Sequence, residues 1–102
     1  MTTTEAFPHA PETIAAELVT NMPEFGLHAM PGYARIAITH RLDLVLTTDV
    51  FNSTLILWEL TGHIGDGRLA SQRADVVAGE LPADPVAALA QVTNLCQVWA
   101  DR

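Results

Sequence analysis

Apolar and polar residues alternate through the segment 33–47, which predicts β-structure with one face in contact with solvent. Most apolar side chains fall on even numbers and most polar ones on odd numbers. The even set is Ala34, Ile36, Ile38, Leu42, Leu44 and Leu46, and the odd set includes Arg35, Thr39, Arg41, Asp43 and Thr47. We therefore expect the even-numbered side chains to face the core of a sheet.

The residues of this segment do not specify a turn. No Gly or Asn stands between Ile38 and Asp43 to form a tight hairpin. A two-residue turn within 39–41 would set Ile38 opposite Asp43, which is a poor core pair. We therefore favour one long bent or bulged strand over 33–47, and keep a hairpin with an odd-length loop as the alternative.

Two more strands are expected downstream. After a turn at 49–53, residues 55–60 are apolar on both parities, as in a strand covered by helices on one face and by a partner on the other. The segment 61–67 is a connection, because its glycine spacing does not match the dinucleotide-binding fingerprint. Residues 68–77 predict an edge strand, with a helix over 71–81 as the rival interpretation.

A helix is expected over 11–22, before the sheet. Pro11 suits its first turn, its apolar residues recur at spacings of three and four, and Pro23 ends it. The segment 23–32 is then predicted as a connector that ends in a type II turn at Pro31-Gly32.

A second helix begins near the C-terminus. Asp84 is expected to cap its N-terminus and Pro85 to occupy its first position. Its apolar stripe consists of Val86, Leu89, Val92, Cys96 and Trp99. Because this helix is more apolar than the first, we expect it to lie across the sheet as the main core element.

These elements predict an α+β fold: a helix, an antiparallel meander of three to four strands and a helix, with both helices on one face of the sheet. The 102 residues suffice for one domain, which we place at 11–102 after a flexible N-terminus at 1–10. No apolar run reaches the roughly 18 residues of a membrane span, and residues 1–12 do not resemble a secretion signal. The expected location is the cytoplasm.

Charge is unevenly distributed along the chain, whose formal net charge is −7. Residues 1–34 and 74–101 each contain four carboxylates and neither lysine nor arginine, whereas charges balance in between. Such a field repels nucleic-acid backbones and attracts basic protein surfaces. Direct binding of nucleic acid is therefore not expected.

Catalytic motifs are not found in the sequence. Cys96 is the only cysteine and lies on an apolar helix, there is no lysine, and no nucleophile stands beside a base at a familiar spacing. Three His-x-x-acid pairs, beginning at His9, His40 and His63, fall on segments not expected to be helical, where residues three apart do not share a face. We therefore expect no enzyme activity, no cofactor and no metal site.

The leading interpretation is a small acidic protein-binding module. It would act on a basic nucleic-acid-handling complex as an inhibitor, as anti-CRISPR or anti-restriction proteins do, or bind its target as immunity proteins do. The expected partner-binding carboxylates are Glu12, Glu17, Glu24, Asp75, Glu80 and Asp84. Phe25, Trp58 and Trp99 are candidate interface anchors, although a core position is the favoured reading for each.

One alternative belongs to another functional class. A homodimeric domain could hold a small molecule between sheet and helices, or act there as a small enzyme, with Tyr33, His40 and His63 near the pocket. Another alternative is a structural subunit that assembles through an exposed sheet edge or face.

Overall fold

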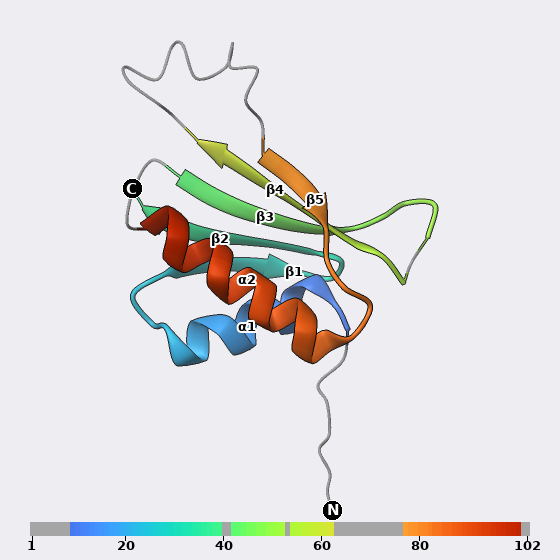
Figure 1. Cartoon of the computed structure of the whole chain (residues 1–102), viewed down its shortest axis with the longest axis horizontal. Coiled ribbons are helices and arrows are strands. Elements are labelled where there is room, and N and C mark those ends of the chain that lie inside the picture. The colour runs from blue at the N-terminus through green and yellow to red at the C-terminus, as the bar shows by residue number, and fades with distance from the viewer. Residues whose placement is uncertain (1–8, 40–41, 53, 63–76, 101–102) are drawn as a thin grey trace, which may run out of the picture.

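The computed structural model describes residues 9–39, 42–52, 54–62 and 77–100. Its elements are α1 (Pro11–Asn21), β1 (Gly26–Met30), β2 (Tyr33–Thr39), β3 (Leu42–Thr48), β4 (Ile56–Gly62), β5 (Val77–Glu80) and α2 (Pro85–Ala100). The strands form one antiparallel sheet in chain order, and both helices lie on the same face of it (Figure 1). The α+β class and the order of helix, meander and helix are confirmed.

The sheet has five strands because the predicted connector at 23–32 contains one of them. β1 pairs with β2 across a two-residue turn, Pro31-Gly32. Gly32 has a φ of 76°, whereas the ring of Pro31 fixes a negative φ at the preceding position. Negative φ followed by positive φ at the two central residues defines the type II turn that the sequence predicts. All five residues of β1 are exposed, so no alternation between buried and exposed positions distinguished this strand in the sequence.

The segment 33–47 forms a hairpin, so the single bent strand that we favoured is wrong. β2 and β3 are antiparallel partners. Even-numbered residues still face even-numbered residues across the hairpin, as Ile36 faces Leu44. The expected grouping of apolar side chains on one face is therefore confirmed, although a hairpin and not a single strand produces it.

A bulge in β2 resolves the conflict of register. Ala37 faces Asp43, but the next pair joins Thr39 to Leu42, so one extra residue, Ile38, lies between them on β2. Ile38 therefore does not meet the Asp43 carboxylate and stays 7% exposed in the core.

The core lies between the sheet and the two helices. From the strands it takes Ala34, Ile36, Ile38, Leu44, Leu46, Ile56, Trp58 and Leu60. α1 packs on β1, β2 and β3, while α2 packs on α1 and β2. The main helical cover of the sheet is thus α1, not α2 as expected, since α2 packs partly on α1.

The helix ends follow from local chemistry. α1 ends at Asn21, one residue before the predicted end, just ahead of Pro23. At α2 the Asp84 carboxylate accepts a hydrogen bond of 2.9 Å from the Ala87 N–H, which confirms the predicted cap. The stripe buried on α2 is Ala88, Val92 and Cys96, with Leu89, Leu95 and Trp99 partly buried, whereas Val86 at its start is 58% exposed.

The region before α2 agrees only in part with expectation. β5 covers residues 77–80 at the sheet edge, so a helix over 71–81 is excluded for those four residues. Most of the strand predicted at 68–77, together with residues 1–8 of the predicted flexible terminus, lies outside the described residues. Neither described helix is long and apolar enough to cross a membrane.

A hydrogen bond joins α1 to the turn between β1 and β2. The Glu12 carboxylate accepts it from the Gly32 N–H at 3.0 Å, in a partly buried position. Glu12 is also in the first turn of α1, where the helix dipole favours a negative charge. This carboxylate therefore has a structural role.

We predict that Glu12→Ala lowers the free energy of unfolding by roughly 1 to 2 kcal/mol, because the substitution leaves the Gly32 N–H without its charged acceptor. Glu17→Ala is the matched control on the same helix, where the side chain is exposed, and it should change stability by less than about 0.5 kcal/mol. Chemical denaturation of both variants checks this, and equal losses would contradict it.

Candidate protein-binding surface

The face of the sheet opposite the helices has no cover from any described segment (Figure 1). Paired residues of neighbouring antiparallel strands point to the same side, so the register defines rows across this face. One row runs His28, Arg35, Val45, Glu59 and Ala78, and the next runs Met30, Tyr33, Thr47, Leu57 and Glu80. We call these two rows the open face.

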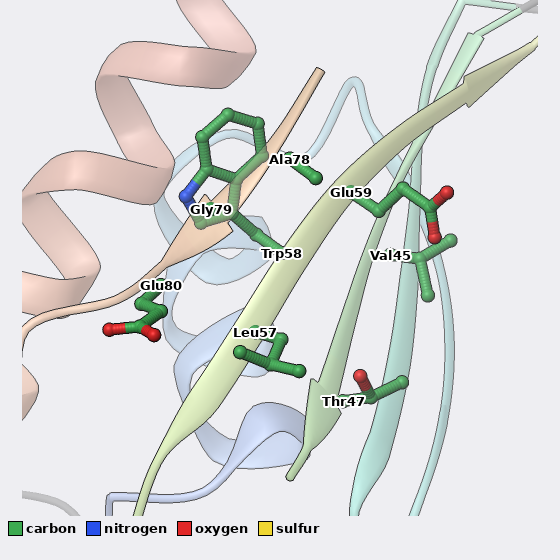
Figure 2. Close-up of a pocket in the computed structure, with 8 residues that line it drawn as sticks. All are labelled: Val45, Thr47, Leu57, Trp58, Glu59, Ala78, Gly79 and Glu80. Atoms are coloured by element: carbon green, nitrogen blue, oxygen red, sulfur yellow. The ribbon is translucent and has the colours of Figure 1, made fainter. Parts of the chain in front are cut away.

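A groove of about 390 Å³ occupies the β3 to β5 side of the open face. Its lining residues are Val45, Thr47, Leu57, Trp58, Glu59, Ala78, Gly79 and Glu80. Figure 2 shows the side chains of Val45, Thr47 and Glu59 directed to one side of the sheet, with the Trp58 ring on the other. The groove is therefore a surface feature of the sheet and is separate from the core.

The groove combines an apolar floor with negative charge. Val45 and Leu57 are half-buried and supply the floor, while Glu59 and Glu80 are exposed. Glu59 lies opposite Ala78 and Leu57 opposite Glu80, so the two glutamates are diagonal neighbours, about 7 to 8 Å apart at the backbone. Figure 2 shows the two carboxylates at opposite sides of the groove and directed away from each other, so each is available to a separate cationic side chain with an apolar stem, such as arginine.

Trp58 forms the boundary between the groove and the core. It is 9% exposed, and its indole ring packs over Gly79 on the paired strand. The Nε1–H of the ring is buried without a hydrogen-bond partner. Gly79 makes this packing fit, because a Cβ at that position would lie 2.9 Å from Trp58 Nε1.

We predict that Gly79→Ala destabilises the fold by about 1 to 3 kcal/mol, because the new methyl group forces the indole ring from its position. In a Trp58→Phe background the smaller ring leaves room, so the same substitution should cost less. Gly26→Ala is the control, since a Cβ there would meet Ala37 at an ordinary 3.4 Å. Thermal unfolding of the set measures the coupling, and equal costs in both backgrounds would contradict the packing argument.

The structure does not bring the predicted partner-binding carboxylates together. Glu17 on α1 and Glu24 after it are exposed, Glu80 lines the groove, and Asp84 caps α2. Glu12 is engaged with the Gly32 N–H, as described above. Asp75 lies outside the described residues. No acidic residue stands within α2, so its outer surface is neutral.

The three candidate anchors lie in or against the core. Phe25 is 5% exposed and Trp58 is almost as buried, so neither presents a ring to a partner. Trp99 is half-buried on α2 and packs against the same core cluster.

Large exposed apolar side chains lie instead in the loop between β3 and β4. Val50 is 87% exposed and Phe51 is 93% exposed. Asn52 orders the loop, because its side-chain oxygen accepts hydrogen bonds from the Thr54 N–H and hydroxyl. The sequence predicted this turn but not the exposure of its phenylalanine, since a turn signal does not say which way a side chain points.

Of the residues expected near a pocket, Tyr33 alone lies in the described part of the chain. No group of three metal-binding side chains is found there. Tyr33 lies on the open face and makes an edge contact with the His28 ring at 6.4 Å between centroids, so it does not line a space between sheet and helices. His40 and His63 lie outside the described residues.

Cys96 is fully buried on α2, and burial raises the pKa of its thiol to about 12. A thiol protonated over the physiological range is a poor nucleophile. The sequence reading of Cys96 as a small core residue agrees with this environment.

No family model, curated protein or solved structure matches this chain. The geometry and charge of its surface therefore indicate what the protein can bind.

We predict that Cys96 of the folded protein resists Ellman's reagent. Because the native pKa is about 12, raising the pH to about 9 should accelerate the reaction of the denatured chain and not that of the folded one. Thiol release is followed by absorbance with and without guanidinium chloride. Rapid native labelling at neutral pH would show that α2 opens or that the thiol is accessible.

Proposed function

We propose that this protein is a non-enzymatic binding module that recognises a basic protein segment through the open face of its sheet. The observation that carries the proposal is the groove, in which Glu59 and Glu80 flank an apolar floor. An arginine side chain of a partner would place its aliphatic stem on Leu57 and Val45 and its guanidinium against the Glu59 carboxylate, and a second basic side chain would pair with Glu80.

Net charge supports the same class of partner. A formal charge of −7 on 102 residues favours encounter with a basic surface and disfavours binding to nucleic acid itself. A basic surface of this kind is common where proteins handle nucleic acids. The proposed biological role is therefore inhibition of a nucleic-acid-handling complex, by occupying the path of its substrate.

This proposal moves the binding site from the helices to the sheet. The acidic faces expected from the sequence would use Glu17 and Glu24, which are exposed on and just after α1, and neither residue lines the groove. A groove contributes desolvated apolar contact as well as charge, whereas isolated exposed carboxylates contribute little to affinity.

The test is affinity capture from the lysate of the native host with three forms of the protein. The wild type is compared with Glu59→Gln/Glu80→Gln and with the matched variant Glu17→Gln/Glu24→Gln, which loses the same charge elsewhere. We expect the wild type and the helix variant to retain the same basic protein at low salt, and the groove variant to lose it. High salt should release the partner, because exposed ion pairs are screened.

Two outcomes would contradict this proposal. Loss of the partner from the helix variant alone would return the binding site to α1. Retention by all three forms at high salt would show that recognition does not depend on these charges.

A further inference from the structure

The open face carries opposite charges on its two sides. Arg35 lies on β2 and Glu59 lies on β4, in the same row, with Val45 of the central strand between them. Two strand spacings separate the two backbones by about 10 Å. Both side chains are exposed, and within the described part of the chain neither takes part in a hydrogen bond or an ion pair.

This arrangement is self-complementary under one particular symmetry. A two-fold axis parallel to the strands and above β3 places β2 of one copy over β4 of a second copy and keeps each row in place. Arg35 then faces Glu59 of the second copy, and the reverse pair forms on the other side of the axis. Val45 faces its own counterpart at the centre.

The neighbouring row agrees with the same placement. Tyr33 on β2 would face Leu57 of the second copy, and Thr47 would face its counterpart on β3. An aromatic ring would thus cover the half-buried floor of the groove. A two-fold axis perpendicular to the strands and above this row would instead set Arg35 over Arg35 and Glu59 over Glu59, so charge favours the first arrangement over this one.

We infer that the open face is also a dimerisation surface, on which a second copy of this chain packs sheet against sheet. The dimer would have four layers, with helices outside and two sheets about 10 Å apart inside. The inference goes beyond the proposed function, because it needs Arg35, which the groove does not.

The available area indicates a reversible dimer. The longest strands have seven residues, so five strands at their usual spacing give a projected face of roughly 440 Å². Stable interfaces commonly bury about 800 Å² of accessible surface on each partner. Asp43 also faces its own counterpart near the axis, which opposes association. We therefore expect a dissociation constant on the order of 10 to 100 µM.

Charge reversal tests the inference with the whole chain in analytical ultracentrifugation. Arg35→Glu and Glu59→Arg should each weaken the dimer at least about 100-fold, because both symmetry-related pairs become like charges. The double variant exchanges the two charges and should dimerise like the wild type. A mixture of the two single variants should form a heterodimer although neither associates alone.

Circular dichroism of each variant confirms folding, which exposed positions on a formed sheet should permit. A wild type that remains monomeric above 10 times the expected dissociation constant would overturn the inference. Dimerisation of the single variants as strong as that of the wild type would also overturn it. So would a mixture of the two single variants that forms no heterodimer although the wild type dimerises. Arg35→Glu leaves Glu59 and Glu80 in place, so continued capture of a basic partner by this variant separates the failure of dimerisation from the failure of the proposed function.

Discussion

The register of the hairpin between β2 and β3 determines which side chains the whole sheet buries. A shift of one residue in a strand moves all of its side chains to the opposite face. The extra residue at Ile38 absorbs such a shift at the closed end of the hairpin, so Ile36 and Leu44 remain together in the core. The same register gathers Arg35 and Val45 on the open face. The composition of the core and that of the open face therefore depend on one bulge.

The placement of both helices on one face follows from the same division. Even-numbered side chains of β2, β3 and β4 belong to one apolar core. α1 packs on β2 and β3 of this sheet, and α2 packs on β2 and on α1. The odd-numbered side chains of these strands are too mixed in polarity to hold a further helix, since Arg35 and Glu59 stand among Val45 and Leu57. A surface of apolar centre and charged rim is typical of a site for reversible association.

The sequence was sufficient to predict the class of fold, because alternation in 33–47 and the helical periods at both ends are strong signals. It was insufficient for β1, whose residues are all exposed and follow no period. The hairpin was kept only as the alternative, because the residues of its turn include no Gly or Asn and its bulge is a tertiary solution to a register conflict. The groove was also missed, because it forms only when β4 pairs with β5. This pairing brings Glu59 and Glu80 to one groove although they are 21 positions apart in the sequence.

Self-association and partner recognition would use one surface, and this has a thermodynamic consequence. A second copy on the open face places Tyr33 over Leu57 and an arginine beside Glu59, the residues that a basic partner would contact. Partner binding must then compete with dimerisation, so the apparent affinity falls as the protein concentration rises above the dimer dissociation constant. In the absence of a partner, the second copy would cover the apolar floor of the groove. This would lower the risk that the open face of the sheet aggregates. Because Arg35 would contribute to the proposed dimer and does not line the groove, a substitution at this one position would adjust the balance without changing the groove.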